Sequence, residues 1–276
     1  MLFISMVDAV FLGDSWLDDK WNEHRTWGAI LAESEKWTYL NLSKAGCTTE
    51  YIIDTIKTHP GLKNTDASTQ WIIHIGGNDL LYWVIKNPFR ITYDISKRKK
   101  HFFKNKGEEI ALRISHIVEY IITHYDATNI TISSNTACYG VPLCRAFGLF
   151  YTPFTTRQHM DLITAEVNLA LLRVTGHLIH IHPKVRFSFY NECKTCIEES
   201  DKISWKWDLF HPTKQSHYIL AESFKQSIQL PLHTHISYFT HLQEYTNLQN
   251  YHFLISFIFS SALLFIFLKN FGTSLE

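Results

Sequence analysis

The sequence lacks a net charge, which argues against a nucleic-acid partner. Its 26 Lys and Arg residues are balanced by 26 Asp and Glu residues over 276 positions. A chain without an excess of charge has no global field that would concentrate nucleic acid or another acidic polymer around it. The abundant 16 histidines make the net charge positive only below neutral pH.

The amino terminus lacks the basic residues that open a secretory signal peptide. The first basic residue is Lys20, and Asp8 interrupts the apolar run before it. A signal peptide needs a basic segment, an apolar core and a cleavage site of small residues. The stretch is more typical of a buried first strand, so we expect a domain that faces the cytosol.

Cysteines are few and odd in number, which favours reduced thiols in such a domain. The sequence contains Cys47, Cys138, Cys144, Cys193 and Cys196. The last two have the spacing of a zinc or redox pair, and Cys138 and Cys144 could complete four ligands, but their spacing is irregular. A structural zinc site or a disulfide is therefore the less favoured alternative. His180 and His182 alternate on an expected strand, and no third ligand accompanies them. We therefore expect no metal and no cofactor.

Charge is also absent from a long run near the carboxyl terminus. Residues 253–268 are uncharged, and with Tyr251 and His252 the run approaches the ~17–25 residues that span a bilayer. Apolar residues on all sides argue against a helix lying on the membrane surface, and a buried core helix is the other alternative. We expect a single-pass tail anchor over 251–269, joined by a polar linker over 229–250. The sequence does not indicate which membrane is involved.

Alternating strand and helix patterns predict one α/β domain over residues 1–228. Apolar runs predict strands at 8–12, 37–42, 70–75, 129–133 and within 178–190. Helical spacing predicts helices at 26–35, 49–57, 108–124 and 157–174, with a last one opening at Pro212. This alternation is typical of a parallel sheet covered by helices on both faces.

Residues suited to acyl transfer follow three of these strands and the last loop. The first strand ends in Gly13-Asp14-Ser15, Gly46 follows the second, and the third ends in Gly76-Gly77-Asn78-Asp79. The carboxyl ends of parallel strands share one edge of a sheet, where ligands bind. A serine hydroxyl is a nucleophile there, while a glycine N–H and an asparagine amide can donate to an oxyanion.

A carboxylate and a histidine complete the set. Asp208 precedes His211 by three residues, so its carboxylate can reach Nδ1–H on one tight turn. That leaves Nε2 facing the serine as general base. Each motif is common alone, but the four blocks in this order make coincidence improbable.

These blocks resemble those of the SGNH (GDSL) hydrolase family over residues 7–228. The resemblance implies a flavodoxin-like three-layer α/β/α sandwich with a five-stranded parallel sheet. It implies Ser15 as nucleophile, His211 as base and Asp208 as its orienter, with no metal or organic cofactor. The backbone N–H groups of Ser15 and Gly46 and the amide of Asn78 would form the oxyanion hole. Trp16 stands where leucine often follows the serine, at a position that varies in the family.

The expected function is hydrolysis of carboxylic esters, and the membrane anchor favours lipid or acyl esters over acetyl esters. An acyltransferase using the same acyl-serine is an alternative, as is a noncatalytic membrane-anchored binding module. The basic and aromatic run at 97–104 is either a solvated loop or a flap that contacts anionic headgroups. Trp205 and Trp207 are either an acyl or sugar wall or packing residues.

Overall fold

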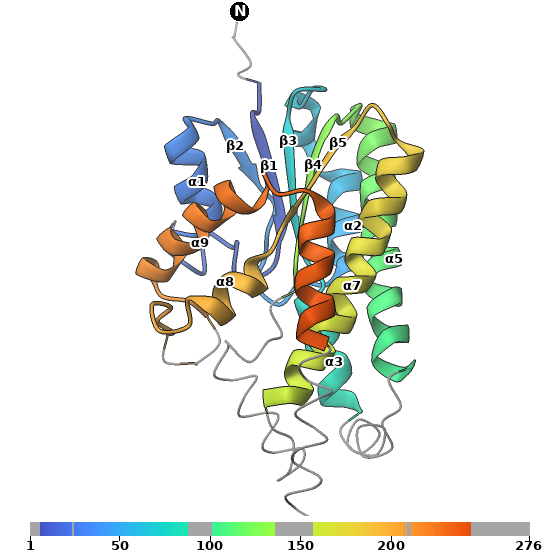
Figure 1. Ribbon diagram of the computed structural model, residues 1–276. Helices are drawn as coiled ribbons and strands as arrows, with labels where there is room; N and C mark the ends of the chain where they lie inside the picture. Colours follow the sequence, from blue (N-terminus) through green and yellow to red (C-terminus); the bar gives the residue numbers. More distant parts are fainter. Residues whose placement is uncertain are drawn as a thin grey trace, which may run out of the picture.

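Five parallel strands form the centre of the molecule. The computed structural model describes residues 6–23, 25–87, 101–135, 157–206, 208 and 211–243. The strands are β1 (Ala9–Gly13), β2 (Tyr39–Asn41), β3 (Gln70–His74), β4 (Asn129–Ser133) and β5 (Arg186–Tyr190). They pair in the order β2-β1-β3-β4-β5, and every pairing is parallel (Figure 1). The expected five-stranded parallel sheet is confirmed.

Helices cover both faces of the sheet, as Figure 1 shows. On one face, α1 (Trp27–Glu35) packs against α9 (Lys214–Ser227). On the other lie α2 (Thr49–Thr58), α5 (His101–Tyr125) and α7 (Arg157–Ile181). Shorter elements are η1 (Pro60–Asn64), α3 (Gly77–Lys86) and α8 (Glu192–Glu198). The three layers are those of the flavodoxin-like sandwich that the sequence predicts.

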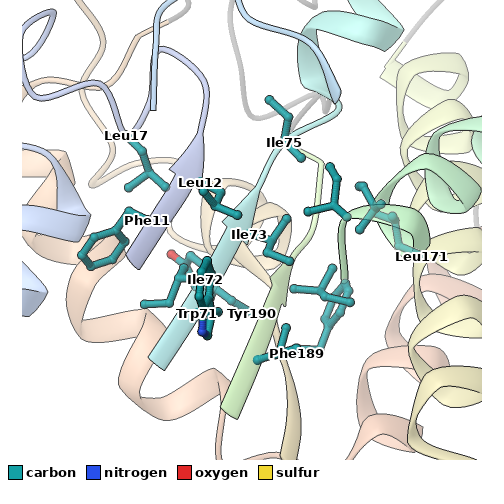
Figure 2. Close-up of a cluster of buried hydrophobic side chains, with 14 of the residues drawn as sticks. Phe11, Leu12, Leu17, Trp71, Ile72, Ile73, Ile75, Leu171, Phe189 and Tyr190 are labelled. Atoms are coloured by element: carbon teal, nitrogen blue, oxygen red, sulfur yellow. The ribbon is translucent and has the colours of Figure 1, made fainter. Parts of the chain in front are cut away.

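The apolar character of the strands explains why they lie inside. All five residues of β1 are buried, and four of the five residues of β3 are buried. A parallel strand covered on both faces has no polar side to present, so its sequence is a continuous apolar run. Figure 2 shows Phe11, Trp71 and Phe189, from three different strands, among the buried side chains of this core.

The boundary between α7 and β5 differs from the prediction. The helix continues to Ile181 and the strand begins only at Arg186, so His180 and His182 do not alternate on a strand. The prediction was wrong because Leu178, four residues after Val174, continues the helical spacing of the apolar residues. His182 follows the helix, and its Nε2 lies 2.9 Å from Glu119 Oε2.

The expected linker also contains regular structure. Residues 232–243 form a helix whose Phe239 and His235 are buried, so at least this part packs onto the domain. None of the described helices combines the length and apolar character needed to cross a bilayer. The expected anchor over 251–269 lies outside the described residues, as do Cys138, Cys144 and residues 97–100.

Candidate active site

A tight turn after β1 presents Ser15 at the carboxyl edge of the sheet. The Asp14 carbonyl accepts the N–H groups of Leu17 and Asp18 at 3.1 and 3.0 Å, which closes the turn. Asp14 Oδ1 accepts the Trp16 N–H at 3.1 Å. Gly13 is needed just before, because an added Cβ would lie 3.0 Å from the carbonyl oxygen of His74. The turn thus forms where two strands approach closely.

The structure brings Ser15, His211 and Asp208 into one line of hydrogen bonds. Ser15 Oγ lies 2.7 Å from His211 Nε2, across 196 residues of chain. His211 Nδ1 lies 2.5 Å from Asp208 Oδ2, and the His211 N–H donates to Asp208 Oδ1 at 3.0 Å. Oδ2 of Asp208 therefore orients the ring of His211, while Oδ1 fixes its backbone. Such an arrangement can deprotonate a serine during attack on a carbonyl.

Two polar side chains join the serine turn to the histidine loop. Asn22 Nδ2 donates to the Ser15 carbonyl at 2.7 Å, and Lys206 Nζ donates to Asn22 Oδ1 at 2.7 Å. The Lys206 N–H in turn donates to the His211 carbonyl at 2.7 Å. Nucleophile and base are thus held by a chain of bonds that does not involve their reactive atoms.

The three expected oxyanion donors are linked through Cys47, whose thiol donates to the Gly13 carbonyl and whose own carbonyl accepts from Asn78. Gly46 has φ +77°, a left-handed conformation that favours glycine. Within the described residues, neither the Ser15 N–H nor the Gly46 N–H has an internal acceptor. Asn78 Nδ2 donates to the Cys47 carbonyl at 3.0 Å. An amide carries two N–H groups, so this bond fixes the side chain and leaves one donor for a ligand.

A buried carboxylate anchors the turn that carries Asn78. Asp79 accepts the N–H of Thr49 at 2.9 Å and its hydroxyl at 2.7 Å, at the start of α2. Arg113 on α5 reaches the same carboxylate at 3.3 Å. The asparagine therefore sits in the first turn of α3, which is tied to α2 and α5.

A buried charged cluster lies beneath Ser15. His74, at the end of β3, is 5% exposed, and its Nε2 lies 2.5 Å from Glu192 Oε2 at the start of α8. Its Nδ1 faces Asp14 Oδ1 at 3.7 Å. Burial opposes the charged ring, yet the attraction and hydrogen bond of Glu192, together with Asp14, raise the pKa of His74 to about 9. Burial raises the pKa of Asp14, and the charge of His74 opposes that shift.

One exposed aromatic ring borders the candidate base. The Trp21 ring centroid lies 5.5 Å from that of His211, and Trp21 is 51% exposed. Trp205 instead packs against Trp16, with centroids 5.9 Å apart, which favours its interpretation as a packing residue. Trp207 lies outside the described residues.

The cysteines and histidines considered as metal ligands do not gather here. Cys47 is buried, its thiol donates to the Gly13 carbonyl at 3.0 Å, and burial raises its pKa to about 12. Cys193 and Cys196 are buried on α8. Within the described ranges, no three His, Cys, Asp or Glu side chains are grouped so that they could hold a metal ion.

Comparison by sequence finds no relative, whereas comparison by structure does. No family model matches the chain, and no curated protein matches it. A phospholipase A1 from Streptomyces albidoflavus aligns with a TM-score of 0.51 at 14% identity, over 81% of this chain and 100% of its own. A lipolytic protein of the GDSL family from Veillonella parvula aligns with a TM-score of 0.52 at 15% identity, over 81% and 98%. A family 3 carbohydrate esterase from Clostridium thermocellum gives 0.50 at 14% identity, over 81% and 95%.

The chain has the SGNH (GDSL) hydrolase fold. The resemblance inferred from the four motifs is thereby confirmed at the level of the fold. The SGNH fold also explains the placement of the motifs, since three of them follow strands whose carboxyl ends reach the same edge and the fourth lies on the loop before α9.

Sequence reasoning missed two residues at this site of the SGNH fold. It took His74 as a hydrogen-bonded core residue, which is confirmed, but it did not identify Glu192 as the partner. The available signal was an acidic residue directly after the apolar end of the fifth strand. It also missed Trp21, whose only local signal is that an aromatic residue lies close after the serine.

Proposed function

We propose that this chain is a serine ester hydrolase that forms an acyl ester on Ser15. The observation that carries the proposal is the line of contacts from Ser15 Oγ to His211 Nε2 to Asp208, at 2.7 and 2.5 Å. A part-buried line of this kind, together with donors for the oxyanion, is what acyl transfer requires. The fold, which several lipases and esterases share, supports the same chemistry.

The proposed reaction has two halves. Ser15 Oγ attacks the ester carbonyl carbon while His211 Nε2 takes the hydroxyl proton, and the negative charge develops on the carbonyl oxygen. His211 then gives the proton to the leaving alkoxide, which departs as an alcohol and leaves an acyl ester on Ser15. A water attacks that ester with His211 again as base, which releases the carboxylic acid and restores the serine.

The donors stabilise the charge that develops in each half. The N–H groups of Ser15 and Gly46 and the Asn78 amide would donate to the oxyanion. Their positions are fixed before the substrate arrives, so little reorganisation is needed during the reaction. Asp208 keeps Nδ1 protonated and stabilises the imidazolium that forms on His211.

Lipid or acyl esters are the proposed substrate class. The exposed ring of Trp21 beside His211 offers an apolar surface next to the reacting atoms. One structural neighbour is a phospholipase A1 and another a carbohydrate esterase, so acetylated sugars are the competing class. Chain-length dependence of hydrolysis separates the two.

The test uses the full chain, a fluorophosphonate probe and a series of p-nitrophenyl esters. Ser15→Ala should abolish both labelling and turnover, whereas Ser34→Ala, which alters an exposed serine on α1, should leave both unchanged. A rate that rises from acetyl to longer acyl esters supports lipid substrates. A folded wild-type protein that neither labels nor turns over refutes the proposal and favours the binding module.

We also propose that residues 251–269 anchor the domain in a membrane. The uncharged run from Phe253 to Leu268 supports this proposal from the sequence alone. The full chain should then remain in the membrane fraction after carbonate extraction, while a chain ending at residue 250 should be released. Release of both chains refutes the anchor.

A further inference from the structure

The buried ring of His74 is hydrogen-bonded to one carboxylate at Nε2 and faces a second carboxylate at Nδ1. Glu192 Oε2 lies 2.5 Å from Nε2, and Asp14 Oδ1 lies 3.7 Å from Nδ1. The side chains of Glu192 and Asp14 are 0% and 8% exposed. Two carboxylates around one imidazole favour a ring protonated on both nitrogens, since each end then meets a negative partner.

Aromatic rings enclose the same imidazole. Trp16 lies nearly parallel to it, with centroids 6.2 Å apart and an interplanar angle of 23°. Trp27 approaches edge-on, with centroids 5.9 Å apart. An electron-rich indole face attracts a cation, so the nearly parallel face of Trp16 is the ring contact that suits an imidazolium.

We propose that His74 is a positioning residue that, as a buried imidazolium, keeps Asp14 ionised and so fixes the turn that carries Ser15. This inference rests on the proposed serine hydrolase function. Asp14 Oδ1 accepts the Trp16 N–H at 3.1 Å, so the carboxylate bridges the residues on either side of the nucleophile. A charged acceptor makes this bond roughly twice as strong as a neutral one.

The effect on rate follows from the position of Ser15 inside that bridge. Misplacing a reacting group by about 1 Å costs on the order of 10²-fold in rate. Burial raises the pKa of Asp14, and without His74 only the Trp16 N–H and the charge of His211 would oppose that rise. The buried cation is the largest opposing influence, and it acts without touching the substrate.

Other titratable groups surround the cluster, and in the part of the chain that the structure describes none replaces His74 as a cation held against Asp14 inside the core. From α9, His217 faces it, and burial lowers the pKa of His217 to about 3, so this ring stays neutral. On β5 and α8, Tyr190 and Cys196 lie near Glu192; burial and Glu192 raise the pKa of Tyr190. His217 is therefore neutral near neutral pH, and the side chains of tyrosine and cysteine never carry a positive charge.

The remaining charged groups belong to the active-site edge. His211 and Asp79 interact with Asp14, and Lys206 with His217. Cys47 also faces Asp14, and burial followed by the negative charge of Asp14 raises the pKa of this thiol to about 12. Of these, Lys206 is committed to Asn22, so His74 is the cation that the geometry assigns to Asp14.

The experiment compares the full-length wild type with His74→Gln, Glu192→Gln and a matched control, His182→Gln. Gln at position 74 keeps a donor for Glu192 but cannot become charged. His182 is also a histidine paired with a glutamate, but it lies at the far end of α7. Fluorophosphonate labelling rates, kcat and KM for a p-nitrophenyl ester are measured across pH, and circular dichroism checks the fold.

Loss of the cation should change the pH profile and not only the rate. In His74→Gln, kcat near neutral pH should fall about 10-fold or more with KM little changed. The acid limb of the pH–rate profile should shift to higher pH by about one unit or more, because Asp14 loses an opposite charge close by. The difference in kcat between His74→Gln and the wild type should become smaller as pH rises, whereas His182→Gln should have the wild-type profile. Glu192→Gln should move the limb in the same direction.

A second measurement reads the charge directly in the wild type. Nitrogen-15 NMR of the histidine rings, assigned by the signal missing in His74→Gln or shifted in Glu192→Gln, should show both nitrogens of His74 protonated at pH 7. A neutral ring there overturns the inference, even if the position 74 variant fails to fold. Parallel pH profiles in wild type and His74→Gln overturn it as well. A folded wild type that does not label at any pH instead refutes the proposed function.

Discussion

Replacing the buried His217 by asparagine should make the domain more resistant to acid. His217 is 1% exposed, and its Nδ1 accepts the Trp27 N–H, the first of helix α1, at 3.2 Å. Burial, followed by the charges of Lys206 and His211, lowers its pKa to about 3. The Oδ1 of asparagine can accept the same N–H, so His217→Asn keeps the helix-capping bond and removes only the titration.

The direction and size of the stability change follow from the pKa of His217 in the folded and the unfolded chain. Its pKa falls from 6.5 when unfolded to about 3 when folded, so the unfolded chain binds a proton that the folded one excludes. Stability is therefore lost as pH falls from 6.5 towards 3. At about 1.4 kcal/mol for each unit of pKa, the loss is about 5 kcal/mol, comparable to the whole stability of many domains. His235, whose pKa burial lowers to about 4, contributes in the same direction.

Urea unfolding followed by tryptophan fluorescence measures this loss. Between about pH 4.5 and 6.5, the slope of unfolding free energy against pH should be lower by about 1.4 kcal/mol per pH unit in His217→Asn than in wild type. Exposed His233→Asn should keep the wild-type slope. His74 does not enter this window, because its pKa is raised to about 9 and its stabilisation is lost only as pH rises from 6.5 to 9. Equal slopes in wild type and His217→Asn would refute the reasoning.

Three further predictions concern catalysis and packing. Asp208→Asn should lower kcat on the order of 10⁴-fold, since the amide no longer holds the correct tautomer of the base; a loss below 10-fold would contradict an orienting role. Asn78→Ala should lower kcat about 10²- to 10³-fold with KM nearly unchanged, and a change confined to KM would exclude it as an oxyanion donor. Gly107→Ala should cost about 1–3 kcal/mol in urea unfolding, because its methyl would lie 3.0 Å from Val167 Cα. Gly176→Ala should gain about 0.5–1 kcal/mol, because its methyl would meet Leu232 Cδ2 at an ordinary contact distance of 3.6 Å. Equal stabilities of the two glycine variants would contradict the packing argument.

Local patterns were enough to predict the sheet and the strand ends. The apolar run before Ser15 predicts β1 because a strand buried on both faces has no polar positions, and the structure has β1 at Ala9–Gly13. Asp208 and His211 lie within one turn, so their contact follows from spacing alone. The meeting of that turn with Ser15 was expected only through the resemblance and the shared edge of the sheet.

What could not be predicted depends on contacts between distant parts of the chain. The pairing of His74 with Glu192 spans 118 residues, and no periodicity in either segment encodes it. The prediction ended α7 too early because residues 178–182 alternate between apolar and polar, as a strand does. That alternation is shorter than the helical spacing of apolar residues before it, and the helix continues to Ile181. The helix at 232–243 was missed because most of its residues are polar, so the two buried side chains, His235 and Phe239, do not form a recognisable apolar pattern.

The 196 residues that separate Ser15 from His211 also bear on synthesis. A chain emerging from the ribosome presents its nucleophile and the oxyanion donors long before its base. Contacts that close such long loops form late, since the loop entropy must be lost first. A nascent chain that ends before Asp208 would carry an inert serine, and reactivity would switch on only when α9 packs against α1. Probe labelling of Ser15 would then report when the folding of the domain is complete.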